Sequence, residues 1–367
     1  MELIVAGNTL QLQSLDAGMD VAFTKLHSAW LSSSATDAQE FNDAALLFFA
    51  NHIGNWAAHD AYFNNFTIIW NKYRSANQFD RAEDVWRFAL RPAWHWEQTN
   101  PGQYIHKGTA YYFWAVTAIE RGELDKGYFL MHQAVAEDAR TSGEEFPQRP
   151  ATYLATLNYQ PTEQAFRGWI LEQAHYLYSF LEDYRANRGG LLTIDDLRRR
   201  FLTHPPSRAI VFLFAFGLAR ASRIQAIPPF ARQSPFAGQL QLNLLFDLTL
   251  VIDGAIKAKS PSVWKFIDLA AFLNGKRRLG LNKTELRRLN KAFNHDFETT
   301  LQTYLDGLGR LTNGSTVPPL AADLGIAYGI RNRGAHGVEG TPSVWTRFGD
   351  IHQSLLNTLF WAVEDLY

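Results

Sequence analysis

Two side chains near the C-terminal end of the sequence have the chemistry needed to act on a phosphate group. They are Arg331 and His336, the first and last residues of the segment Arg-Asn-Arg-Gly-Ala-His. An arginine presents a planar fork of donors that matches phosphate oxygens, and a histidine exchanges a proton near neutral pH. The segment therefore predicts acid–base chemistry on a phosphate, with Arg331 stabilising negative charge and His336 moving the proton.

The residues before this segment predict the helix that positions it. Three apolar residues and the arginine fall on one stripe, with spacings of four, three and four: Leu320, Leu324, Ala327 and Arg331. An arginine on such a stripe is costly unless it is paired or opens into a pocket. Gly334 weakens the helix, and Gly337 is expected to cap it. His336 would then lie at a frayed helix end, where a separation of five residues need not keep its side chain away from that of Arg331.

Residues 331–336 resemble the signature of HEPN domains, a helical family with many ribonucleases of toxin–antitoxin, abortive-infection and CRISPR-associated systems. The resemblance covers roughly residues 236–367, and a first long helix is expected over about 238–259. A last helix is expected over 344–367, directly after the helix that carries the motif. Five apolar residues of this last helix are expected to face the core: Phe348, Ile351, Leu355, Leu359 and Val363.

The resemblance implies metal-independent cleavage of RNA, in which the ribose 2′-hydroxyl of the substrate is the nucleophile. His336 would be the general base or acid, Arg331 would hold the scissile phosphate, and Asn332 would orient the motif or contact phosphate. The products would end in a 2′,3′-cyclic phosphate and a 5′-hydroxyl, and DNA would resist because it lacks the 2′-hydroxyl. Family members usually pair so that two motifs face each other, so we expect a homodimer through the C-terminal domain.

The family often carries a polar residue on its first helix that supports the motif. Asp247 and Asp253 are the candidates, because both interrupt the apolar run of the helix expected over 238–259. Either carboxylate could pair with Arg331. The alternative is that both are surface positions or belong to purely structural pairs.

A run of basic residues upstream of the motif could neutralise the phosphates of an RNA. Glu285 is the one acidic residue within this run, whose basic members are Lys276, Arg277, Arg278, Lys283, Arg287, Arg288 and Lys291. Arg333 within the motif would join them. Such contacts position a nucleic acid without reading its sequence. The alternative is a solvated helix face, which is also how we interpret the arginines at 198–200.

An internal repeat organises the N-terminal part of the chain. The segments that begin at Phe79 and Leu124 match each other, and the helices expected before them match at the same offset of 45 positions. Each unit is predicted to be a pair of antiparallel helices joined by a short turn, and residues 111–138 resemble a tetratricopeptide repeat. Alternation from Leu3 to Gln13 around Gly7 predicts a small hairpin before the helices.

These patterns predict an all-α protein in three parts. We expect helical-hairpin repeats over residues 1–185, a linker or connecting region over 186–235 and a HEPN-like helical bundle over 236–367. Charge is distributed unevenly: residues 1–190 carry 14 basic against 22 acidic residues, a net −8, and residues 191–367 carry 21 against 14, a net +7. The basic half is expected to meet a polyanion such as RNA. The alternative is that the two halves attract each other, or that the asymmetry has no functional meaning.

The composition excludes several other classes. Hydrophobic residues make up 47% of the 367 residues, enough for a large core, and the lack of cysteine excludes disulfides and Cys-ligated zinc. We find no Walker loop or dinucleotide-binding motif, and the lone Glu-x-x-His of Glu172 and His175 lacks the second motif of a di-iron site, so no cofactor or metal is expected. The N-terminus lacks the pattern of a signal peptide, and the longest apolar run, 209–219, is too short to span a bilayer. We therefore expect a cytoplasmic protein without a membrane anchor.

The leading hypothesis is an endoribonuclease effector of the toxin or anti-phage defence type. Its N-terminal helical domain would hold it inactive or sense a trigger, through a regulatory protein or a ligand. The alternative is a non-catalytic helical-repeat adaptor that uses a HEPN-like module for dimerisation or RNA binding. A third possibility is a toxin whose site is silenced by a partner protein or by modification. The presence of both Arg331 and His336 favours an enzyme, because a scaffold needs neither.

Overall fold

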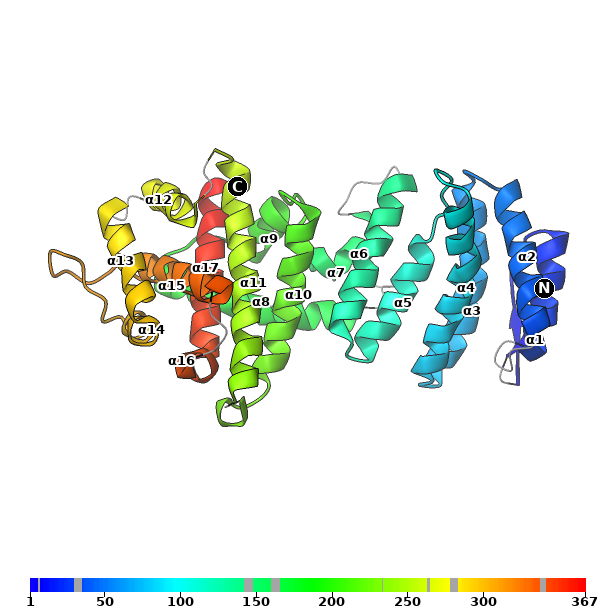
Figure 1. Ribbon diagram of the computed structural model, residues 1–367, viewed down its shortest axis with the longest axis horizontal. Helices are drawn as coiled ribbons and strands as arrows, with labels where there is room; N and C mark the ends of the chain where they lie inside the picture. Colours follow the sequence, from blue (N-terminus) through cyan, green and yellow to red (C-terminus); the bar gives the residue numbers. More distant parts are fainter. Residues whose placement is uncertain are drawn as a thin grey trace. The chain divides into compact units, whose positions relative to one another are not determined.

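The computed structural model is almost entirely helical (Figure 1). It describes residues 1–5, 7–29, 35–141, 148–159, 166–232, 234–262, 265–277, 283–336 and 341–367. Apart from one two-stranded hairpin, the regular elements of these residues are helices, so the predicted all-α class is confirmed. The chain forms two compact units, Met1–Thr152 and Tyr153–Tyr367, and each has its own buried core.

The first unit opens with a small hairpin and two helices. These elements are β1 (Glu2–Val5), β2 (Asn8–Gln11), α1 (Ala17–Ala29) and α2 (Ala35–Asn51). The strands are antiparallel, with Val5 opposite Asn8. Gly7 lies between them with a φ of 76°, a left-handed conformation that glycine adopts without strain. Leu3 and Val5 are buried, so the hairpin predicted from this alternation is confirmed.

Two helical hairpins follow in the first unit. They are α3 (Trp56–Ser75) with α4 (Phe79–Thr99), and α5 (Gly108–Glu120) with α6 (Leu124–Thr141). Each turn contains one left-handed residue, Asn77 or Gly122, at equivalent positions of the sequence repeat. The Asn77 N–H donates to the Arg74 carbonyl, and the Gly122 N–H donates to the equivalent carbonyl of Ile119. The two turns therefore share a left-handed residue and the same hydrogen bond.

Polar contacts between these helices are buried with the aromatic core. Trp70 of α3 donates its indole N–H to the Thr117 hydroxyl of α5 at 2.8 Å. Lys107, directly before α5, is buried, and its ammonium group pairs with the carboxylates of Glu97 and Glu137. Because a buried ammonium is costly without such partners, these residues fix the segment that leads from α4 into α5. A short helix η2 (Pro150–Thr152) packs on α6 and ends the unit.

The second unit is a bundle built around three long helices. Its elements are α7 (Tyr153–Thr156), α8 (Arg167–Arg188), α9 (Ile194–Leu197), the π-helix η3 (Arg198–Leu202), α10 (Arg208–Gln225), η4 (Pro229–Arg232), α11 (Pro235–Lys259), α12 (Phe266–Arg277), α13 (Lys283–His295), α14 (Phe297–Leu305), α15 (Pro319–His336), α16 (Pro342–Thr346) and α17 (Phe348–Leu366). Helices α11, α15 and α17 pack against one another. All five α17 residues that were expected to face the core are buried, which confirms that prediction.

The first compact unit ends before the boundary that we expected at residue 185. Helix α8 packs against α17, and α10 packs against α11, so residues 167–225 belong to the second unit (Figure 1). Arg188, at the end of α8, donates from Nε to Oδ2 of Asp323 on α15 at 2.7 Å. The Asp323 carboxyl is buried, and burial raises its pKa, while the Arg188 guanidinium opposes that shift. This buried pair ties α8 to the motif-bearing helix.

Helix α11 is long and apolar enough to cross a membrane by length and composition alone. The core helix of a water-soluble protein passes the same test. Here half of the tested window is buried inside the unit, where α11 packs against α10, α15 and α17.

Candidate functional site

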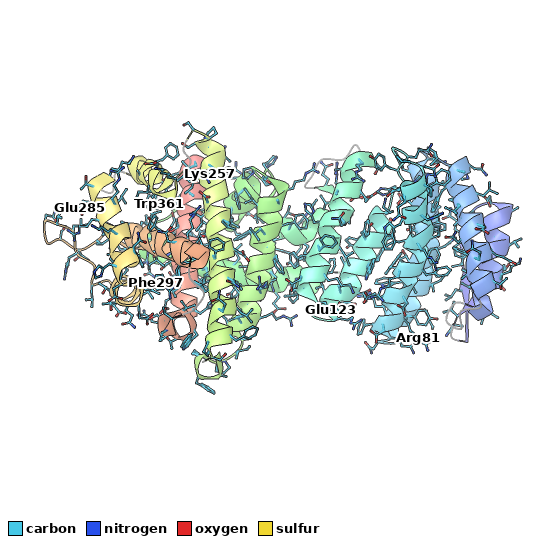
Figure 2. The ribbon with its side chains drawn as sticks, viewed as in Figure 1. Arg81, Glu123, Lys257, Glu285, Phe297 and Trp361 are labelled. Carbon is cyan, nitrogen blue, oxygen red and sulfur yellow. The ribbon has the colours of Figure 1, made fainter. Side chains whose placement is uncertain are left out.

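Arg331 lies in the last two turns of α15 and pairs with a carboxylate of α11. Its Nη2 is 3.7 Å from Oδ2 of Asp253, and the Arg331 side chain is half-buried, with 29% exposed. Lys257, one turn further along α11, also contacts Oδ2 of Asp253, at 2.8 Å. Figure 2 marks Lys257 near the C-terminal end of α11. The arginine on the apolar stripe is therefore paired, as its position in the sequence required.

The two predicted supporting carboxylates have different partners. Asp253 is almost fully buried, and its Oδ1 accepts no hydrogen bond from the residues that the structure describes. Asp247 lies two turns earlier on α11 and pairs with Arg220 of α10 at 3.5 Å. Burial raises the pKa of Asp247, and the charge of Arg220 lowers it in part. Of the two candidates, Asp253 is the one that the structure pairs with Arg331.

Glycines allow other helices to approach α15 closely. A Cβ added at Gly334 would lie 2.6 Å from the Cβ of Phe246 on α11, and one added at Gly329 would clash with the ring of Phe293 on α13. We expected Gly334 only to weaken the helix, but α15 continues through it to His336. Because Gly334 has no side chain, α11 can pack directly against the motif-bearing part of α15.

Asn332 and Arg333 face the ends of α13 and α14. Asn332 donates from Nδ2 to Oδ1 of Asn294 at 3.3 Å. The Arg333 guanidinium lies over the ring of Phe297, 5.8 Å from its centroid. A cavity of about 470 Å³ opens between these groups, and His295 also lines it. The motif therefore borders a hollow with amide, aromatic and basic side chains on its walls.

His336 is the last residue of α15, and its side chain lies outside the described residues. Its backbone lies one helical turn beyond Asn332. Arg331 is one position before Asn332 and turns toward α11. The motif thus divides between a face held by Asp253 and a face that borders the cavity.

The predicted basic residues are described in part. Helix α13 buries Leu286 and Leu289 and exposes the basic side chains of Arg287, Arg288 and Lys291. Arg288 donates to the Arg310 carbonyl at 2.8 Å, and Lys283 pairs with Asp268 at 2.5 Å. Arg278, and the side chains of Lys276 and Arg277 in α12, lie outside the described residues.

A second cavity continues along the same helix. It has a volume of about 460 Å³, and Arg288, Lys291 and Arg310 line it. His295 lines this cavity and the one beside the motif. The two hollows therefore share His295 in their lining, with Arg288, Lys291 and Arg310 along one of them and Arg333 along the other.

Sequence reasoning missed three residues of this site: Asn294, His295 and Phe297. They lie where α13 ends and α14 begins, between the predicted basic run and the motif. Asp296 accepts from the Thr299 N–H and caps α14, which would explain the polar composition of this turn by itself. The sequence offered no signal that these side chains meet Asn332 and Arg333, because that contact depends on the packing of α13 against α15.

Comparisons with known proteins found no family model, no curated protein and no solved structure that matches this chain. A functional assignment therefore depends on the motif and on the site around it.

Proposed function

We propose that the protein is a metal-independent endoribonuclease of the HEPN type. The observation that carries the proposal is the ion pair between Arg331 and Asp253, which holds the guanidinium of the motif at the end of α15. Beside it, Asn332 borders a cavity at the end of α13, a helix whose residues Arg287, Arg288 and Lys291 are exposed and basic. An anchored arginine, a histidine position and a basic approach are the parts that phosphodiester cleavage needs.

The proposed reaction uses the 2′-hydroxyl of the substrate as its nucleophile. A base, His336, removes the hydroxyl proton while the 2′-oxygen forms a bond to phosphorus. The bond from phosphorus to the 5′-oxygen breaks, and this oxygen receives a proton from an acid. The guanidinium of Arg331 stabilises the charge that develops on the phosphate oxygens. The products end in a 2′,3′-cyclic phosphate and a 5′-hydroxyl.

A homodimer would supply the second proton-transfer group. In the family that the motif resembles, two motifs face each other, so one His336 can act as base while the partner's copy acts as acid. We propose the same arrangement for the C-terminal part of this chain, with RNA as its substrate in the cytoplasm.

We propose that the first unit regulates this activity as a tetratricopeptide-like interaction module. The repeated turn chemistry of the hairpins α3–α4 and α5–α6 supports this assignment. Hairpins of this kind stack to present surfaces to a protein or ligand. The same hairpins also favour the second candidate, a non-catalytic adaptor that keeps the HEPN-like module for dimerisation or RNA binding.

Cleavage of a labelled single-stranded RNA in EDTA separates the two candidates. The nuclease predicts cutting by the wild type, and loss of cutting in Arg331→Ala and in His336→Ala. The matched control is Arg185→Ala, which removes an exposed arginine of α8 that pairs with Glu182 of the same helix. RNA that binds without being cut favours the adaptor, and cutting that survives both motif substitutions contradicts the assignment of the site.

A further inference from the structure

The cavity beside the motif has the size and the lining of a binding site for one nucleotide unit. Its volume of about 470 Å³ lies within the range of roughly 300 to 1,000 Å³ typical of small-molecule sites. It lies where α13 ends and α14 begins, against the α15 residues Asn332 and Arg333. The proposed cleavage acts on the phosphate, and it assigns no ligand to the walls of this cavity.

Two amide side chains supply adjacent hydrogen-bonding groups. The Nδ2 of Asn332 donates to Oδ1 of Asn294, which leaves the Asn294 amide nitrogen as a donor and the Asn332 amide oxygen as an acceptor. A neighbouring donor and acceptor match the edge of a nucleobase, since asparagine is a common partner of base edges. Asn294 is exposed and Asn332 is half-buried, so both can be reached from solvent.

An aromatic ring and a guanidinium provide flat surfaces in the same cavity. Arg333 lies over the half-buried ring of Phe297 at 5.8 Å from its centroid. The buried ring of Phe293 also lines the cavity and packs on Gly329, where a side chain would collide with it. Unpaired bases stack on aromatic rings and on arginine planes in proteins that bind single-stranded RNA. An apolar floor, a stacking surface and an amide pair together are the recognition chemistry of a base.

We propose that this cavity binds one unpaired nucleobase of the RNA next to the scissile phosphate, with Asn294 contacting its edge. The proposal builds on the proposed function, because it takes RNA as the ligand of this site. It assigns base preference to Asn294, which lies outside the motif, whereas Arg331 and His336 act on the phosphate.

Binding of RNA that cannot be cut tests this proposal without relying on cleavage. The probes are four fluorescently labelled homotetramers of A, C, G and U with 2′-O-methyl riboses, which block the nucleophile. Fluorescence anisotropy with the full chain should show one base bound at least about tenfold more tightly than the weakest, since a good pair of base contacts discriminates by about this factor or more. Equal affinity for all four bases would overturn the proposal.

Asn294→Asp is the decisive variant. A carboxylate at 294 can still accept from Asn332, but it replaces the donor with an acceptor and adds a charge. The charge weakens all four probes alike and leaves their ranking unchanged, whereas loss of the donor should change or erase the ranking of the bases. The control Asn51→Asp makes the same substitution at an exposed position of the first unit and should preserve the ranking. A ranking unchanged by Asn294→Asp would also overturn the proposal.

The failure of this proposal can be told apart from failure of the nuclease. A base ranking that depends on Asn294, in a protein that cuts no RNA, supports the cavity and rejects the cleavage. Arg331-dependent cutting in EDTA, with equal binding of the four probes, supports the nuclease and rejects the cavity. Circular dichroism melting of each variant checks that its helices remain intact.

Discussion

Arg331 of α15 and Asp253 of α11 form an ion pair in which Nη2 lies 3.7 Å from Oδ2. The pair ties the proposed phosphate-binding arginine to the first long helix of the second unit. Lys257 contacts the same carboxylate oxygen. Asp253 therefore balances two cations, Lys257 one turn along α11 and Arg331 near the end of α15. Removal of its charge would take away the carboxylate that these two cations share.

The substitution Asp253→Asn should therefore lower RNA cleavage more than it lowers RNA binding. We expect kcat to fall by about tenfold or more, because a catalytic group displaced by about 1 Å can lose about a hundredfold in rate. Asp247→Asn is the matched control, since Asp247 pairs with Arg220. Equal losses of kcat in the two variants would show that Asp253 does not position the motif.

Close packing at Gly334 makes a second prediction. Gly334→Ala puts a methyl group 2.6 Å from the Cβ of Phe246, and overpacking of this kind costs about 1–3 kcal/mol of unfolding free energy. It should also displace the motif and reduce cleavage. Gly217→Ala in α10 meets no atom within 4 Å, so it should leave the second unit unchanged or more stable by up to about 1 kcal/mol. Denaturant titration measures both; a stabilised Gly334→Ala would contradict the packing.

The basic face of α13 can be tested through salt dependence. Lys291→Ala removes an exposed ammonium that lines the cavity next to His295. If it contacts one phosphate, the slope of log affinity against log salt should become shallower by about 0.7 for single-stranded RNA. Lys283 is paired with Asp268, so Lys283→Ala should change the slope less. Identical slopes for Lys291→Ala and the wild type would show that Lys291 does not contact an RNA phosphate.

A buried histidine sets a pH dependence of stability in the second unit. Burial lowers the pKa of His352 from 6.5 to about 3, and its ring stacks on that of Phe348 with the centroids 5.8 Å apart. The unfolded chain binds the proton first as pH falls below 6.5, so the protein loses stability between about pH 6.5 and 3. Each unit of pH in this window costs about 1.4 kcal/mol through this residue.

His352→Phe should remove that contribution while it keeps the aromatic packing. The Nδ1 of His352 has no hydrogen-bond partner among the described residues, so the substitution breaks no hydrogen bond of that atom. Urea unfolding at pH 7, 6 and 5 measures the effect. The free energy of unfolding of the variant should rise relative to that of the wild type as pH falls. A difference between the two proteins that stays the same at all three pH values would show that His352 titrates normally in the folded state.

Local patterns predicted much of the second unit. The period of Leu320, Leu324 and Ala327 identified the buried face of α15, and the apolar residues of α17 follow the same rule. The N-terminal hairpin also followed from alternation around Gly7. These features depend on residues that are close together in the sequence, which is why a single chain reveals them.

Contacts between distant residues could not be predicted in the same way. Asp247 and Asp253 interrupt the same apolar run, and only the packing of α15 on α11 decides which of them meets Arg331. The same holds for Asn294, which meets Asn332 because α13 packs on α15. The division of the chain into compact units at Tyr153 depends on such contacts too, since the packing of α8 against α17 leaves no local pattern.

The chemistry of the product ends shows whether the 2′-hydroxyl of the RNA is the nucleophile. A single-stranded RNA and a copy with one 2′-deoxynucleotide at the main cleavage position would be incubated with the full chain in EDTA. Attack by the 2′-hydroxyl should give 2′,3′-cyclic phosphate and 5′-hydroxyl ends from the first RNA, and no cutting at the substituted position of the second. Cutting that continues at the deoxynucleotide, or products with 3′-hydroxyl and 5′-phosphate ends, would contradict attack by the 2′-hydroxyl.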